Sequence, residues 1–128
     1  MATASKNIFG EELIPCSTNP MTGFFRDGCC KTGAFDTGTH TVCAIMTEEF
    51  LSFTKSKGND LTSPIAAYDF PGLKPGDHWC LCVNRWKEAL DAGVAPKLVL
   101  EATNERTLDY VKMDTLLAYA TKETSDRQ

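Results

Sequence analysis

The chain has 128 residues, of which 42% are hydrophobic and 23% are charged, a composition typical of one soluble globular domain. Its net charge of −4 and its pI of about 5.1 argue against binding to nucleic acid or to anionic membrane surfaces, which attract basic proteins. The sequence has no apolar run of about 18 residues and no signal peptide at its N-terminus, so we expect a cytoplasmic protein.

The N-terminal third of the chain is predicted to be mainly loop. Residues 1–6 and 121–128 are small, polar or charged, and we interpret both as flexible tails of a single domain that spans 7–120. Residues 15–38 show neither helical nor strand periodicity, and they contain four glycines and two adjacent cysteines. Long loops inside a compact domain often carry function.

A strand and a helix are predicted next. Residues 39–46 are rich in β-branched and apolar side chains, which is typical of a buried strand. Thr47 is a favourable N-cap for the helix that follows, and Gly58 is a favourable residue for its end.

The second half of the chain continues this alternation of strands and helices. We expect, in order, a strand at 78–83, a helix from Asn84 to Gly93, a strand at 97–102, a short helix opened by Asn104 and a last helix capped by Asp114. Three strands with helices between them predict an α+β fold, with a small mixed sheet of about three to five strands and helices packed on it. The long N-terminal cysteine-containing loop is expected to lie against the cysteine-bearing strands.

Several long motifs of unusual composition carry a family resemblance. They are Cys16-Ser17-Thr18 with Thr22-Gly23-Phe24-Phe25-Arg26-Asp27-Gly28-Cys29-Cys30, residues 40–44 with 46–51, residues 58–61, residues 70–77, and Trp79-Cys80-Leu81-Cys82 with Arg85-Trp86. With these motifs in this order, the chain resembles, over residues 7–120, the family catalogued as domain of unknown function 2237. The resemblance implies membership of that family and brings no activity, cofactor or catalytic residue with it.

The six cysteines are the residues with the clearest chemical potential. In a reducing cytosol, cysteines are more often free, metal-bound or catalytic than joined in a structural disulfide framework, and we expect the same here. Motifs for phosphate binding, serine hydrolases or zinc proteases are absent from the sequence, so none of them competes with the cysteines.

A metal site is the first interpretation of the cysteines. Cys80 and Cys82 are two residues apart on a predicted strand, so both side chains point to one face. Cys43 lies on a neighbouring predicted strand, with His40 three residues before it. Two or three thiolates and one imidazole are the ligands of tetrahedral zinc, and they also suit other thiophilic metals. The alternative is that these cysteines are small buried apolar residues.

A reactive thiol is the second interpretation. Cys29 and Cys30 lie in the glycine-rich loop beside Arg26 and Lys31, and positive charge lowers the pKa of a nearby thiol. Such a thiol is a candidate catalytic nucleophile or redox centre, with one of the other four cysteines as its resolving partner. Alternatively, one of the two cysteines packs inward and the other lines a turn.

Four further residues are candidates for ligand contact. Arg26 and Asp27 either form an anion-binding corner or pair with each other to order the loop. Arg85 is a candidate ligand contact, and Trp79 and Trp86 are candidates for stacking on a ligand or on Arg85, although Trp79 is equally suited to core packing. For Trp86 we expect a place in the core.

These observations leave three hypotheses for the function. The first is a thiol-centred site that binds a metal ion such as zinc. The second is an enzyme that uses Cys29 or Cys30 as a nucleophilic or redox thiol. The third is a non-enzymatic domain that binds a small molecule or a protein and whose cysteines are structural.

Overall fold

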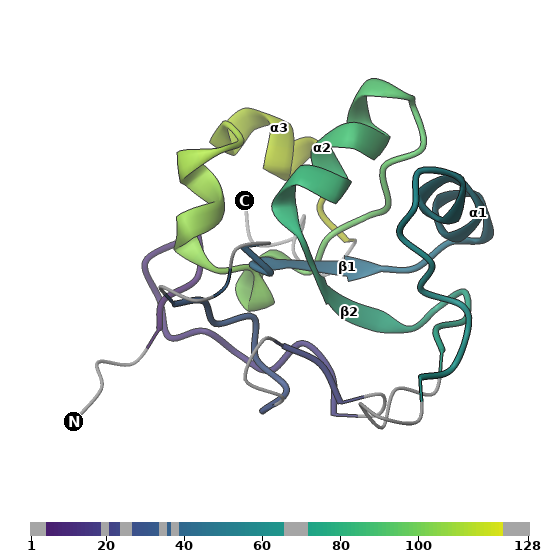
Figure 1. The fold of residues 1–128 in the computed structure, drawn as a ribbon. Helices are drawn as coiled ribbons and strands as arrows, with labels where there is room; N and C mark the ends of the chain where they lie inside the picture. Colours follow the sequence, from purple (N-terminus) through teal and green to yellow (C-terminus); the bar gives the residue numbers. More distant parts are fainter. Residues whose placement is uncertain are drawn as a thin grey trace.

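The computed structural model describes residues 5–18, 21–23, 27–33, 36, 39–65 and 72–121. In these residues the regular elements are, in chain order, β1 (Val42–Ile45), α1 (Glu48–Ser56), β2 (His78–Leu81), α2 (Val83–Asp91), the short 3-10 helices η2 (Leu100–Ala102) and η3 (Glu105–Asp109), and α3 (Met113–Ala118). Figure 1 shows the two strands at the centre, with α2 and α3 on one side and the N-terminal segment on the other. The α+β composition predicted from the sequence is therefore confirmed.

β1 and β2 pair in antiparallel orientation, and their register decides what each face of the pair carries. Cys43 lies opposite Cys80 in this register. The next pair along the strands is Ala44 and Trp79. Because side chains alternate between the two faces of a strand, these pairs point to opposite sides. The second pair belongs to the main apolar core, whereas the two cysteines belong to a separate buried cluster.

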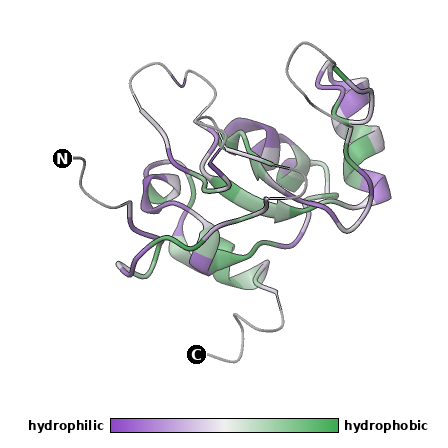
Figure 2. Cartoon of the chain, turned by 90° about the horizontal axis from the view of Figure 1, so that it is seen from below, coloured by the Kyte–Doolittle hydropathy of each residue, from purple (hydrophilic) through white to green (hydrophobic). Residues whose placement is uncertain are grey.

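The apolar core packs the helices against the strand pair. Phe50 of α1, Trp86 of α2 and Leu116 of α3 are fully buried. The Trp86 ring meets the Tyr119 ring edge-to-face at a centroid distance of 5.3 Å, and its Nε1 donates to the Pro96 carbonyl at 3.1 Å. The expectation that Trp86 is a core residue is confirmed. Figure 2 shows hydrophobic residues along the central strands and on the parts of the helices next to them.

Both ends of α1 follow the sequence prediction. The Thr47 side chain accepts a hydrogen bond from the Phe50 amide at 3.1 Å. Gly58, just beyond the last turn, has a φ of +91° and donates its amide to the Lys55 carbonyl at 3.0 Å. These capping signals are local, which is why the sequence alone locates this helix.

α2 starts earlier than predicted. Its N-cap is Cys82, which makes no side-chain capping bond, and Asn84, the predicted cap, lies inside the first turn. Val83 is fully buried and donates its amide to the Thr39 carbonyl at 3.1 Å. Tertiary contacts therefore set the start of this helix, and the predicted cap at Asn84 is wrong.

Of the last two helical segments, one begins at its predicted cap and the other does not. Asn104 opens η3 as predicted, because its side chain accepts a hydrogen bond from the Arg106 amide at 2.9 Å. α3, in contrast, has Lys112 as its N-cap, and the predicted cap Asp114 lies within the first turn. There its carboxylate still suits the positive end of the helix dipole.

The predicted strand at 97–102 does not form, and the described part of the chain contains a two-stranded antiparallel sheet instead of a mixed sheet of three to five strands. Two backbone hydrogen bonds of 2.9 Å join this segment to β1, one on either side of Leu98. Leu98 itself forms single bridges to Ala44 and to Ala120. The backbone then turns into η2, so the pairing ends before it extends into a strand.

The tails predicted at 1–6 and 121–128 fall mainly outside the described residues. Of these tails the structure describes Ser5, Lys6 and Thr121, and each of the three takes part in a backbone hydrogen bond. Across the described residues, every helix is too short or too polar to cross a membrane.

Candidate thiol site

Two disulfide bonds join the N-terminal loop to the strand pair. Cys16 is bonded to Cys43 of β1, with their Cα atoms 5.7 Å apart. Cys30 is bonded to Cys80 of β2, with their Cα atoms 5.2 Å apart. The expectation of cysteines outside a disulfide framework is therefore wrong for these four residues, which we call the four-cysteine site. The strand register places two cysteines side by side, and the loop brings one further cysteine within disulfide reach of each.

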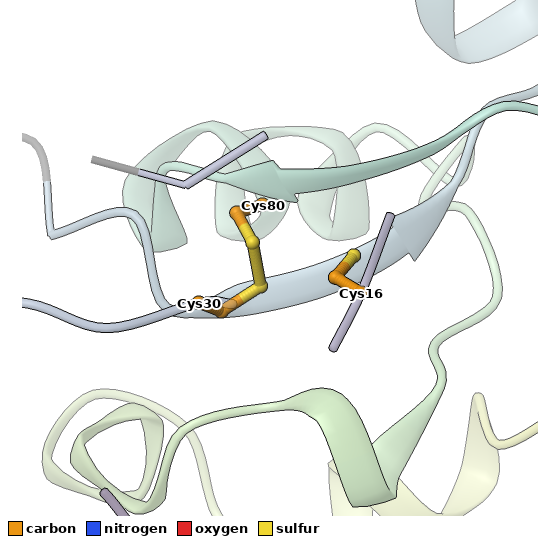
Figure 3. A group of neighbouring side chains, drawn as sticks. All are labelled: Cys16, Cys30 and Cys80. Carbon is orange, nitrogen blue, oxygen red and sulfur yellow. A yellow bond between two sulfur atoms is a disulfide. The ribbon is translucent and has the colours of Figure 1, made fainter. Parts of the chain in front are cut away.

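Three of the four sulfur atoms of the four-cysteine site form a compact group. The Sγ atoms of Cys16, Cys30 and Cys80 all lie within 4.8 Å of one another, and Cys43 is bonded to the first of them. Figure 3 shows the Cys30–Cys80 bond with the Cys16 side chain beside it. The exposed fraction is 7% for Cys16, 2% for Cys80 and 0% for the other two. The site is thus almost closed to solvent, and Cys16 is its least buried member.

Backbone hydrogen bonds and a tight glycine turn hold the N-terminal loop at the site. The Cys16 amide donates to the Gly28 carbonyl at 2.6 Å, and the Gly28 amide donates to the Thr22 carbonyl at 3.0 Å. Gly23 has a φ of +98°, and a Cβ atom at this position would collide with the carbonyl oxygen of Cys29. Only glycine avoids both the strained conformation and the collision. This turn therefore fixes the path of the segment that enters the site.

Buried polar side chains hold the backbone around the sulfur atoms. Thr22 and Thr103 accept hydrogen bonds through Oγ1 from the amides of the two strand cysteines, at 2.9 and 3.2 Å. Asn104 Nδ2 donates to the Cys30 carbonyl at 3.0 Å. The sequence predicted Asn104 only as a helix cap and did not indicate Thr22 or Thr103, because each contact joins positions far apart in the chain and no spacing signals it.

The predicted metal ligands are only partly brought together. Cys43 and Cys80 belong to the four-cysteine site, whereas His40 and Cys82 lie outside the close sulfur group found among the described residues. The His40 ring binds Asp36, with 2.6 Å between Nδ1 and Oδ1. Cys82 is the N-cap of α2, and its thiol is free.

Cys16 and Cys30 complete the site from the N-terminal loop. From the sequence, Cys30 is a candidate reactive thiol and Cys16 is only one of its possible resolving partners. An even number of cysteines is the available signal for pairing, but cysteine spacing does not reveal which residues are joined. The partners follow from the strand register and the loop path, which are properties of the folded chain.

One sequence family matches nearly the whole chain. The family, described as an uncharacterized protein conserved in bacteria (DUF2237), matches residues 6–120. The chain belongs to the DUF2237 family. The resemblance found in the motifs is thus confirmed, and the whole four-cysteine site of this DUF2237 domain lies within the matched residues. No curated protein matches the sequence.

A buried carboxylate orders the approach to β1 in the DUF2237 domain. The Asp36 side chain is inaccessible to solvent and accepts hydrogen bonds from the Thr32 hydroxyl at 3.0 Å and the His40 amide at 2.8 Å. Burial alone raises the pKa of Asp36, but these hydrogen bonds and the His40 imidazole outweigh it and lower the pKa. Thr39, just before His40, has a φ of +52°, which is rare for a β-branched residue and marks local strain.

Cys29 of the DUF2237 domain is free and half-buried, and its environment differs from the prediction. Burial and the Asp27 carboxylate raise the pKa of the Cys29 thiol, and together they outweigh Lys31, which lowers it. Asp27 accepts a hydrogen bond from the Cys29 amide and pairs with Lys31 Nζ, both at 3.0 Å. The expected lowering of the pKa is therefore wrong for Cys29. Arg26, the other predicted cation, lies outside the described residues.

The two remaining candidate ligand contacts both interact with other parts of the protein. Trp79 is buried in the apolar core on β2. Arg85 donates to the Lys57 carbonyl at 3.1 Å and to the Glu88 carboxylate at 3.3 Å. Arg85 thus connects α2 with the end of α1. These contacts give both residues a structural role.

Proposed function

We propose that the four-cysteine site is a redox-gated metal site, which holds two disulfides when oxidised and binds zinc or another thiophilic metal ion when reduced. The observation that carries the proposal is the clustering of sulfur atoms. Three Sγ atoms lie within 4.8 Å of one another, and the fourth is bonded to one of them.

The spacing of the sulfur atoms suits tetrahedral coordination. Since Zn–S bonds are about 2.3 Å long, the sulfur atoms of a tetrahedral zinc site lie about 3.8 Å apart. The unbonded sulfur atoms of this group lie within 4.8 Å of one another, so we expect small side-chain rotations to bring them to this spacing. The two bonded pairs separate to the same spacing once their disulfides are opened.

Metal binding requires reduction first. The two disulfides take up four electrons and four protons from a thiol reductant and give four thiols. A zinc ion then displaces the thiol protons and forms a bond to each thiolate. Because the same sulfur atoms serve both states, a disulfide-bonded chain and a metal-loaded chain are mutually exclusive forms.

The enzyme hypothesis has less support. The raised pKa of Cys29 keeps its thiol protonated near neutral pH, and only the thiolate is an effective nucleophile. Cys30 is fully buried and joined to Cys80. The hypothesis of structural cysteines explains the disulfides but predicts no metal uptake after reduction. Metal uptake by the reduced protein therefore distinguishes it from the proposal.

Titration of the reduced protein with cobalt(II), without oxygen, tests the proposal. We expect uptake of about one equivalent, with thiolate-to-metal absorption that zinc abolishes by displacement. Cys30→Ser should weaken the affinity by at least about 100-fold, because even groups that only orient metal ligands contribute up to about that factor. The absence of cobalt uptake by the reduced wild-type protein would overturn the proposal.

Two matched controls separate the site from a general affinity of thiols for metal. Cys29 is the neighbour of Cys30 in sequence, and Cys82 lies two residues after Cys80, yet both thiols are free. We expect Cys29→Ser and Cys82→Ser to bind cobalt as the wild-type protein does. A loss in either control as large as that in Cys30→Ser would contradict the assigned ligands.

A further inference from the structure

The two disulfides of the four-cysteine site differ in their access to solvent. The Cys30–Cys80 bond joins residues that are 0% and 2% exposed, which leaves an external thiolate no ready approach to either sulfur. Cys16 is 7% exposed and lies between Pro15, which is exposed, and Ser17, which is half-buried. Cys16 is therefore the residue of the site at which we expect an external reductant to enter.

We propose that Cys16 is the nucleophile of an internal thiol–disulfide exchange that carries reducing equivalents to the buried Cys30–Cys80 bond. The inference rests on the redox-gated site proposed above and adds the route by which that site opens. Its physical basis is proximity, because the Cys16 sulfur lies within 4.8 Å of both sulfur atoms of the buried bond.

The first stage consumes one molecule of an external dithiol. One thiolate of the dithiol attacks Cys16 Sγ, forms a mixed disulfide and releases Cys43 as a thiolate, which takes up a proton. The second thiol of the same molecule loses its proton and attacks its partner sulfur in the mixed disulfide. The reductant leaves as a cyclic disulfide, and Cys16 is released as a thiolate.

The second stage moves the remaining disulfide to the accessible sulfur. The Cys16 thiolate attacks the Sγ atom of Cys30 or Cys80, and the other of these two cysteines leaves as a thiolate. This internal step changes no oxidation state, since one disulfide replaces another. A second dithiol then reduces the new bond through Cys16, so that two dithiols are oxidised and the four-cysteine site ends as four thiols.

Cys43 is poorly placed for the same role. Its sulfur is not a member of the close three-sulfur group, and the residue is fully buried on β1. Its amide is also held by Thr103 Oγ1 at 3.2 Å. The Cys16 amide is also held, by the Gly28 carbonyl at 2.6 Å, but Cys16 lies outside the helices and strands and its sulfur belongs to the close group. As free thiols, Cys16 and Cys43 are therefore expected to differ in how readily they attack the Cys30–Cys80 bond.

Cys16→Ser and Cys43→Ser form a matched pair, because each removes the same disulfide and leaves its other partner as a free thiol. In oxidised Cys43→Ser, alkylation and peptide mapping should find Cys16 linked to Cys30 or Cys80 in part of the molecules. In Cys16→Ser, dithiothreitol without denaturant should reduce the Cys30–Cys80 bond about tenfold or more slowly than in Cys43→Ser, since the intramolecular attack is lost.

Partial reduction of the wild-type protein gives a second readout that depends on no variant. Acid quenching should trap a species in which Cys16 is linked to Cys30 or Cys80. Equal reduction rates in the two variants, or the absence of such a linkage from both the wild-type protein and Cys43→Ser, would overturn the exchange. Failure of the exchange leaves cobalt uptake by the reduced protein unaffected, and failure of cobalt uptake leaves the exchange unaffected, so the two proposals fail separately.

Discussion

The two faces of the strand pair are stabilised in different ways. On one face, three helices bury large apolar side chains, among them Phe50, Trp86 and Leu116. On the other face, the described N-terminal residues form no helix or strand, and two disulfides attach them to β1 and β2. Apolar burial does not depend on redox state, whereas a disulfide does. The redox state of the protein is therefore expected to control one face and leave the other intact.

Reduction of both disulfides in the presence of a chelator should cause the largest change. The bonds close loops with sequence separations of 27 and 50 residues. Loops of this size contribute about 3.5 and 4 kcal/mol through the entropy of the unfolded chain. Hydrogen exchange should become fast in the described N-terminal residues while α1, α2 and α3 stay protected, and zinc should restore the protection. Equal loss of protection on both faces would contradict the claim that redox state controls only the face that carries the disulfides.

Trp86→Ala should produce the next largest effect, on the helical face. The side chain is fully buried, and truncation of such a residue costs about 3 to 5 kcal/mol. Because this face is independent of the disulfides, urea unfolding should give the same loss in the oxidised and in the reduced, zinc-loaded protein. Trp86→Phe, which keeps most of the apolar volume, serves as the control and should lose less. A loss confined to one redox state would show that the two faces are coupled.

Asp36→Asn should destabilise the protein by about 1 to 3 kcal/mol near neutral pH, because it weakens the hydrogen bonds that the buried Asp36 carboxylate accepts. The folded-state pKa of Asp36 lies below its ordinary value, so the contribution is complete above the ordinary pKa. It is lost as the pH falls through the folded pKa. Urea unfolding of both proteins should therefore show a difference that is constant above the ordinary pKa of aspartate and shrinks as the pH falls below it. A difference that grows towards acid would contradict this account.

Asp27→Asn should have the smallest effect, which we expect on the reactivity of the Cys29 thiol and not on the stability of the fold. The Asp27 carboxylate raises the pKa of the Cys29 thiol, so its removal should increase the thiolate fraction near neutral pH. Alkylation of Cys29 by iodoacetamide, followed by mass spectrometry, should become a few-fold faster. Cys82 in the same variant provides an internal control whose rate should not change. An unchanged or slower reaction at Cys29 would mean that Asp27 does not control this thiol.

Local signals account for the parts of the fold that the sequence predicted. The capping residue Thr47 and the terminal Gly58 act within a few residues of themselves, and α1 has the predicted ends. The start of α2 was missed because the burial of Val83, which depends on the rest of the fold, decides it. The missing strand around Leu98 has the same cause, since its pairing with β1 ends where the backbone turns into η2.

The location of the candidate site was predictable from the sequence, but its full membership and its disulfides were not. The sequence indicated a site built by the N-terminal loop against the strands that carry Cys43 and Cys80, and the structure joins these parts. It did not indicate disulfides, because the expected compartment argued against them and spacing does not reveal pairing. The contribution of Cys16 depends on the turn at Gly23 and on the hydrogen bond to Gly28, which bring the loop back to the strands.

Native mass spectrometry of the oxidised protein and of the reduced protein exposed to zinc tests the central claim most directly. The account predicts an oxidised chain without metal whose mass is lower than that of the reduced chain by the four hydrogens of two disulfides. It predicts a reduced chain that carries one zinc ion and loses it on reoxidation. Zinc bound equally well by the oxidised protein, or no zinc on the reduced protein, would contradict the claim that the four-cysteine site is a redox-gated metal site.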